Sequence, residues 1–245
     1  MMNNSVNPIR SGLKELDDVI GGFNPGEIVI LVSTDPIVRT AFPLNIALKN
    51  ALNNIPALIL NSETSIEQTG KWTLFMSLAG HQEIPRSMPL YVEEIGDSSI
   101  NELKEKIKRS KETLNIEIVV INSMNYAYQH LPDIEGQYIA GIRGYLNEMK
   151  ALAKELKIVV ILTARIINDL ELPGEIAVGN NLADLLIGVE RLVDEEKENN
   201  KRIITVNRNG KNITMLVVGF NREYFRFHDL DENLKPPTIR IGGSA

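Results

Sequence analysis

The sequence predicts an α/β fold: a mostly parallel sheet flanked by helices, with antiparallel strands at the carboxyl-terminal end. Five short runs rich in β-branched residues carry this prediction, at 27–32, 56–61, 89–95, 116–122 and 158–164. Each run is almost continuously apolar, which is typical of strands covered on both faces. Segments with helical periodicity separate the runs, and this alternation indicates βαβ units and a parallel sheet.

Two of the intervening segments have amphipathic helix patterns. In 139–156 the apolar positions recur at helical spacing, and the opposite face carries charged residues, as the surface of a solvated helix should. The apolar positions are Ile142, Leu146, Met149, Leu152, Ala153 and Leu156. Residues 100–114 form a second segment of this kind. We expect both helices to cover the sheet.

The pattern changes after about residue 184. Strand-like runs at 183–193, 201–207, 212–218 and 223–230 are separated by short polar stretches. Residues 194–200 suit one hairpin tip, and 208–211 suit another because Asn-Gly is a strong tight-turn signal. The carboxyl-terminal third is therefore expected to extend the same sheet with antiparallel strands. No shift in composition calls for a second domain, so we expect one domain at 1–231 and a tail at 232–245.

Composition excludes several classes of site. The chain has 245 residues, a net charge of −6 and no cysteine, which rules out disulfides and thiolate metal sites. Its three histidines are scattered, so a histidine metal cluster is not expected. The acidic balance gives no global attraction to nucleic acid or to anionic membranes. The first residues have no apolar signal core, and no run reaches the roughly 18 apolar residues of a membrane span, so we expect a cytoplasmic protein without a membrane partner.

Residues 28–48, IVILVSTDPIVRTAFPLNIAL, have the layout of a phosphate-binding loop. An apolar strand leads into a short polar stretch that ends in Arg39 and Thr40, and an amphipathic segment follows. Such a loop normally reads G-x-x-x-x-G-K-S/T. Here residues 33–40 contain no glycine and no lysine.

Three further stretches support a relationship to a known family. These are 40–47, 150–166, and 207–210 followed by 223–227. In order and spacing they resemble the carboxyl-terminal motor domain of DnaB-type replicative helicases, a branch of the RecA-like ATPases. The resemblance runs from residue 11 to residue 230 and implies a RecA-like fold with degenerate Walker A and Walker B motifs.

The resemblance implies nucleotide-binding roles for four positions. Arg39 takes the place of the lysine that pairs with the β and γ phosphates, and Thr40 keeps the hydroxyl that ligates magnesium. Asn122 takes the place of the Walker B aspartate. Arg165 takes the place of the glutamine that senses the γ-phosphate. If the site still works, ATP and Mg²⁺ are the expected cofactors.

Two further positions are implied to be catalytic. Glu63 matches the acidic residue that polarises the attacking water. Arg208 matches the arginine of a Lys-x-Arg hairpin that reaches into a neighbouring subunit's site, while Val206 stands where the lysine would be. Each kept residue also has a structural interpretation. Thr40 suits a helix amino terminus, Arg165 suits a salt bridge, and Arg208 suits a polar turn.

The substitutions oppose phosphate binding physically. A phosphate loop points consecutive backbone N–H groups at the anion, and glycine allows the close approach. Val38 places a branched side chain where the phosphate would pass, Pro36 has no N–H to donate, and Asp35 adds a negative charge. Asn122 supplies no negative charge to hold magnesium, although phosphoryl transfer depends on charge neutralisation. We therefore expect no tightly bound cofactor.

Three functional interpretations follow. The first is a helicase-like protein with lost or impaired ATP binding and hydrolysis, acting through self-association or a replication-protein partner. The second is a divergent but active ATP-dependent helicase or ATPase. The third is a regulatory ATPase of the clock-protein or recombinase-paralogue kind. Single-stranded DNA is disfavoured as a partner, because the stretch 166–184 has four acidic residues and no basic residue to track phosphates.

Overall fold

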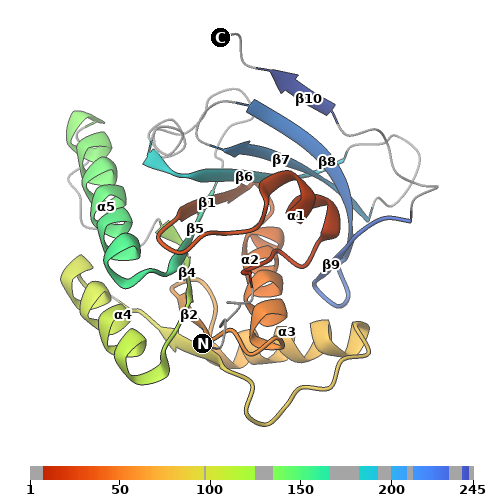
Figure 1. The fold of residues 1–245 in the computed structure, drawn as a ribbon, viewed down its shortest axis with the longest axis horizontal. Helices are drawn as coiled ribbons and strands as arrows, with labels where there is room; N and C mark the ends of the chain where they lie inside the picture. The colour runs from red at the N-terminus through yellow and green to blue at the C-terminus, as the bar shows by residue number, and fades with distance from the viewer. Residues whose placement is uncertain are drawn as a thin grey trace, which may run out of the picture.

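The computed structural model describes residues 8–96, 98–124, 135–165, 182–192, 200–208, 212–231 and 239–242 (Figure 1). The helices are α1 (Lys14–Ile20), α2 (Pro36–Ala51), α3 (Ile66–Ala79), α4 (Ile100–Leu114) and α5 (Glu135–Leu156). The strands are β1 (Ile28–Ser33), β2 (Ala57–Asn61), β3 (Leu90–Glu94), β4 (Ile118–Asn122), β5 (Val159–Arg165), β6 (Leu185–Arg191), β7 (Lys201–Arg208), β8 (Asn212–Asn221), β9 (Arg226–His228) and β10 (Ile239–Gly242).

All of these strands belong to one sheet. Its order is β10-β8-β7-β6-β1-β5-β4-β2-β3, and β9 pairs with β8. The strands from β3 to β6 in this order pair in parallel, and the pairs among β6, β7, β8, β9 and β10 are antiparallel. The predicted α/β fold, parallel in its centre and antiparallel at its carboxyl-terminal end, is confirmed.

Two details of the sheet differ from the sequence prediction. Strand β6 was expected in the antiparallel part, but it also pairs in parallel with β1, where Val29 lies opposite Leu185. Part of the stretch expected to be a tail forms β10, which pairs with β8 and adds a strand to the sheet. Of the predicted hairpin tips 194–200 and 208–211, residues 194–199 and 209–211 lie outside the described residues.

Helices cover both faces of the sheet, as the continuously apolar strands predict (Figure 1). Alternate residues along β1 point to opposite faces. Val29 and Leu31 pack with buried residues of α1, α2 and α3. Ile28, Ile30 and Val32 pack with α4 and α5. Two apolar layers therefore hold the central strands rigidly from both sides.

The two predicted amphipathic helices are present. Helix α4 spans the expected residues, and its start is fixed by a capping box in which Ser99 accepts from the Glu102 N–H. In α5 the predicted apolar positions from Ile142 to Ala153 are buried against the sheet. No helix among the described residues is long and apolar enough to cross a membrane.

The parallel arrangement brings four strand ends to one edge of the sheet. Ser33 at the end of β1 lies opposite Arg165 at the end of β5, and Asn61 lies opposite Asn122. Ligands of open parallel sheets bind at this carboxyl edge. The residues singled out in the sequence at the ends of β1, β2, β4 and β5 therefore meet there.

Candidate functional site

The turn between β1 and α2 is much shorter than the sequence resemblance suggests. Strand β1 ends at Ser33 and α2 begins at Pro36, so Thr34 and Asp35 alone connect them. Residues 36–40 were expected to belong to a loop, and this expectation was wrong. Asp35 caps the helix by accepting a hydrogen bond from the Ile37 N–H at 2.9 Å, and Pro36 occupies the first helical turn. An aspartate cap followed by proline is a strong helix start.

The N–H groups of this turn already have acceptors within the chain. The Thr34 N–H donates to Glu190 Oε1 at 2.8 Å, and the Thr34 hydroxyl donates to Glu190 Oε2. The Asp35 N–H donates to Ser33 Oγ at 3.2 Å. Together with the Asp35 cap on Ile37, two carboxylates of the protein occupy amides that a phosphate would use.

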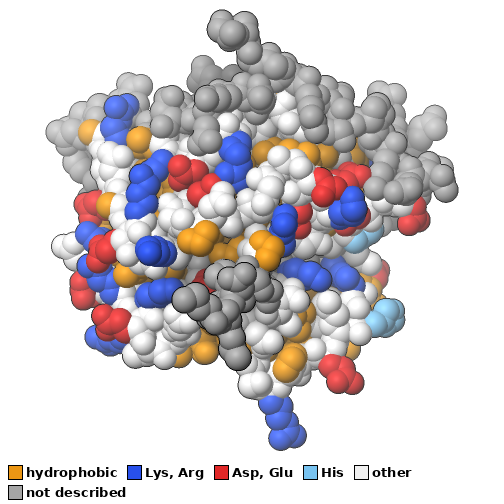
Figure 2. All heavy atoms as spheres, viewed as in Figure 1, with side chains coloured by type: hydrophobic (Ala, Val, Ile, Leu, Met, Phe, Trp, Pro, Cys, Tyr) orange, Lys and Arg blue, Asp and Glu red, His pale blue; other side chains and the backbone are white. Residues whose placement is uncertain are grey.

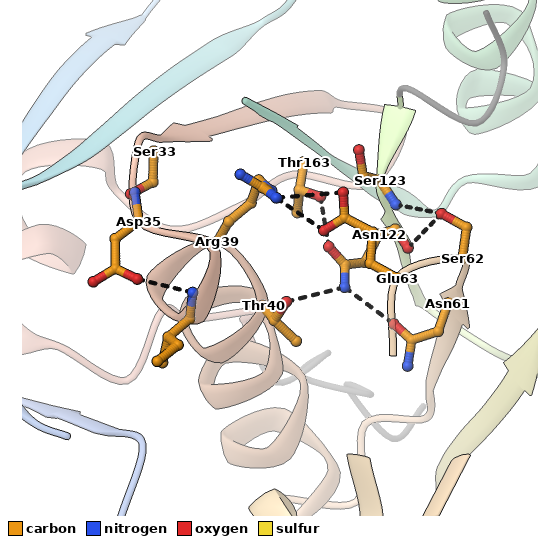
Figure 3. Close-up of polar contacts among 11 residues, drawn as sticks. Ser33, Asp35, Arg39, Thr40, Asn61, Ser62, Glu63, Asn122, Ser123 and Thr163 are labelled. Atoms are coloured by element: carbon orange, nitrogen blue, oxygen red, sulfur yellow. Dashed lines mark hydrogen bonds and ion pairs between the residues drawn. The ribbon is translucent and has the colours of Figure 1, made fainter. Parts of the chain in front are cut away.

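Arg39 and Glu63 form an ion pair above this turn (Figure 3). Arg39 is only 5 % exposed, and its Nη2 donates to both carboxylate oxygens of Glu63, at 3.0 and 3.3 Å. Among the described residues, the buried Nε and Nη1 of Arg39 have no hydrogen-bond partner. Arg39, which was predicted to take the place of the lysine, is thus hydrogen-bonded to Glu63, the predicted catalytic carboxylate.

Asn122 lies at the centre of a buried neutral network (Figure 3). Asn122 is only 1 % exposed. Its Nδ2 donates to Thr40 Oγ1 at 3.3 Å and to Asn61 Oδ1 at 3.2 Å. Its Oδ1 accepts from the Thr163 hydroxyl at 2.8 Å. Asn61 in turn donates from Nδ2 to Thr69 Oγ1 at 2.7 Å. The predicted metal-ligating hydroxyl of Thr40 is therefore bonded to an amide N–H, in a network without charge.

The remaining predicted residues are less closely involved. Arg165 is exposed at the end of β5, and none of the ion pairs among the described residues includes it. Val38, on the first turn of α2, is fully buried in the core rather than lining an open loop. Within the described part of the chain, no cluster of three or more His, Asp or Glu residues could hold a metal.

Arg208 lies at the other edge of the sheet. Arg208 on β7 lies opposite Leu185 on β6, and Leu185 lies opposite Val29 near the start of β1. Ser33 lies four residues further along β1 than Val29, which is about 13 Å along the strand. The Arg208 guanidinium forms an ion pair with Glu27 at 2.5 Å and donates to the Gly22 carbonyl at 2.9 Å. Arg208 therefore does not reach the Arg39 site of its own chain.

Sequence reasoning missed three residues of the site: Asn61, Thr163 and Glu190. Asn61 and Thr163 are polar residues at or near the ends of otherwise apolar strands, which was a readable signal for the carboxyl edge. Glu190 had no such signal, because it is one of the solvent-side residues of an alternating strand. The start of α2 could have been read from Asp35-Pro36.

Comparison with known proteins agrees with this fold. No family model matches the chain. The replicative DNA helicase DnaB of Leifsonia xyli is 21 % identical over 92 % of this chain and 57 % of the helicase. That of Mycoplasma pneumoniae is 22 % identical over 81 % of this chain and 50 % of the helicase. The chain thus spans about half the length of the curated relatives it matches.

Solved structures give the same picture of the fold. A solved ATPase domain superposes with a TM-score of 0.75 at 16 % identity, covering 94 % of this chain and 93 % of that domain. A DnaB-like replicative helicase gives 0.74 at 17 % identity, over 92 % of this chain and 62 % of that one. A KaiC-like protein from Pyrococcus horikoshii gives 0.67 at 17 % identity, over 92 % of this chain and 100 % of that one. The resemblance predicted from the sequence is confirmed: this chain is similar to DnaB replicative helicases over most of its length, and it has the RecA-like fold of the solved structures that superpose with it.

Proposed function

We propose that this protein is a DnaB-related RecA-fold protein that has lost tight binding and hydrolysis of ATP. It acts instead by associating with copies of itself or with a replication protein in the cytoplasm. Residues 1–231, together with strand β10 from the predicted tail, are proposed to work as one domain. The observation that carries the proposal is the neutral network around Asn122, in which the Thr40 hydroxyl is bonded to an amide N–H.

Mg²⁺ does not fit this network. The ion prefers oxygen ligands and nearby carboxylates, whereas Asn122 presents an N–H to the Thr40 oxygen and uses its own oxygen for Thr163. Glu63, the predicted catalytic carboxylate, is bonded to Arg39. A metal at this position would therefore have to break the network and would gain no negative charge from it.

A polyphosphate fits poorly for a second reason. Its binding requires several free N–H groups at a helix amino terminus. The Thr34 and Ile37 amides donate to Glu190 and Asp35, and both of these carboxylates would repel a phosphate. Each lost charge-assisted hydrogen bond costs about 1.5–3 kcal/mol. This loss supports a fall in nucleotide affinity of several orders of magnitude.

One observation favours the alternative, a divergent but active ATPase. The buried Nε and Nη1 donors of Arg39, which have no hydrogen-bond partner within the described residues, are suited to an anion. If nucleotide binds, Arg39 is the residue that we expect to hold it. The two functions are separated by the experiment below.

The protein partner is proposed from the relatives. One structural neighbour is a DnaB-like replicative helicase studied for its interactions with primase. We propose that this chain likewise binds a replication protein or assembles with itself. A solution mass above the 27.4 kDa of one chain would support self-association, and a monomer mass would leave the replication protein as the partner.

The test is a thermal-shift titration with Mg²⁺–ATP up to millimolar concentrations, run alongside an ATPase assay. A ligand at 100 times its Kd adds about 2.7 kcal/mol of stability, which is about 5–11 °C for a domain of this size. We expect no shift and no hydrolysis. The ATPase domain that superposes with this chain serves as the positive control. A clear shift that Arg39→Ala abolishes would overturn the proposal and establish the active ATPase.

A further inference from the structure

Glu190 is a residue outside the family's motifs that contacts the β1–α2 turn. It lies on β6, next to β1, and its two carboxylate oxygens accept the N–H and the hydroxyl of Thr34. A carboxylate that spans two donors of one residue imitates the way an oxyanion is held by a turn. Thr34 is also the first residue after β1, where an anion would approach the helix.

The neighbouring strand β7 completes this arrangement. The Arg202 guanidinium lies 4.0 Å from Asp35 Oδ2 and 4.8 Å from the centre of the Phe220 ring, and the residue is 4 % exposed. Burial lowers the pKa of the Arg202 guanidinium. The charges of Arg191 and Arg222 lower this pKa further, whereas the carboxylates of Asp35 and Glu190 raise it. Arg202 therefore lies beside the turn, where the carboxylates of Asp35 and Glu190 oppose the effect of its burial.

We propose that Glu190 is an internal carboxylate ligand that keeps the β1–α2 turn closed to external oxyanions, an inhibitory contact built into β6. This inference rests on the proposed function, and it explains why the turn has no free amide at Thr34. Because the contact comes from a neighbouring strand, it also couples the turn to the position of the β6–β7 pair. Removing the carboxylate leaves the exposed Thr34 donors to solvent or to an external anion, and takes away one of the two carboxylates that oppose the lowering of the Arg202 pKa.

The experiment compares wild type with Glu190→Ala. In wild type we expect the Thr34 amide to be protected from hydrogen exchange, and inorganic phosphate to leave Tm unchanged relative to chloride at equal ionic strength. In E190A we expect a lower Tm, fast exchange at Thr34, and a saturable rise of Tm with phosphate of about 2–4 °C. The rise reflects phosphate replacing the missing carboxylate.

Two variants serve as controls. Glu93→Ala removes a carboxylate on the edge strand β3, where it pairs with Lys106, and should respond to phosphate like wild type. If E190A folds poorly, Glu190→Asp tests the same contact. Its carboxylate is withdrawn by one methylene and no longer spans both Thr34 donors, so the Thr34 amide should exchange faster than in wild type.

The outcomes separate the two proposals. Equal responses of wild type and E190A to phosphate, or unchanged Thr34 exchange in E190D, would overturn the role of Glu190 and leave the proposed function standing. Binding of Mg²⁺–ATP by wild type would overturn the proposed function, whatever E190A does. A rise of Tm with phosphate in E190A supports both proposals if neither phosphate nor Mg²⁺–ATP changes the Tm of wild type.

Discussion

Arg39, Thr40, Glu63 and Asn122 were predicted from the sequence to share one site, and the structure brings them together at the carboxyl edge of the sheet. Arg39 contacts Glu63, and Thr40 contacts Asn122. Their partners could not be predicted, because side-chain hydrogen bonds depend on rotamers and on neighbours from distant strands. Thr163 and Asn61 complete the network from strands that are remote in sequence.

At the residue scale we predict that Asn122→Asp, which restores the carboxylate of the family, destabilises the protein. The change removes two hydrogen bonds from Nδ2 and sets a carboxylate oxygen against Asn61 Oδ1 in a fully buried position. The cost should be about 3 kcal/mol or more, because the Thr163 hydroxyl is the one donor of this network that the buried charge would keep. Urea denaturation measures it.

Asn147→Asp is the matched control for that variant. Asn147 is exposed on α5, so the same change of charge should alter stability by about 0.5 kcal/mol or less. Similar stability losses in both variants would contradict the buried network. Selective recovery of N122D by millimolar Mg²⁺ would show that the position can hold a metal, and would count against the proposed loss of ATP binding.

At the scale of secondary-structure elements, the strands of the parallel part agree with the sequence prediction to within two residues at either end. Their apolar runs begin and end where the chain enters and leaves a two-sided core, so composition alone marks them. The start of α2 was predicted wrongly, because the layout of a phosphate loop was given more weight than the Asp35-Pro36 cap. Local capping chemistry decided that boundary.

The predicted hairpin arginine, Arg208, is tested at the same scale. We predict that Arg208→Ala and Glu27→Ala each lower the free energy of unfolding by about 1–3 kcal/mol. The loss in the double variant should be smaller than the sum, because the partly buried side chains bond each other and tie β7 to the start of β1. Denaturant titration of the four proteins measures this coupling.

The exposed pair Glu67–Lys71 on α3 provides the control cycle. Both side chains are more than half exposed, and the coupling of such a pair is about 0.3–0.5 kcal/mol. Equal coupling in the two cycles would mean that Arg208 is not held by Glu27, which would leave it available to reach a neighbouring subunit.

At the scale of the whole molecule, charge decides what the surface can bind. Figure 2 shows basic and acidic side chains interspersed on one face, and the described residues on that face form no continuous basic stripe. The net charge is −6. Most of the acidic stretch 166–184, on which the sequence argument against DNA was based, lies outside the described residues. The expectation that single-stranded DNA does not bind therefore rests on the net negative charge and on the mixed charges of the face in Figure 2.

We predict no measurable binding of single-stranded DNA at about 0.15 M salt. Few phosphates would be neutralised, so little free energy would come from counterion release. Fluorescence anisotropy with a labelled oligothymidylate measures this, and the same titration at lower salt gives the slope. Binding at 0.15 M salt with a log–log slope of several units would mean that the chain has a basic track, contrary to this prediction.

The sequence by itself determined the α/β class and the alternation of strands and helices along the chain. It also determined which residues lie at the ends of β1, β2 and β4. These follow from local patterns of apolar and polar residues. The tertiary structure alone decided what those end residues do. Glu190 and Thr163 come from other strands, and whether an amide or a guanidinium is free for a ligand depends on which distant side chain packing places within about 3 Å of it.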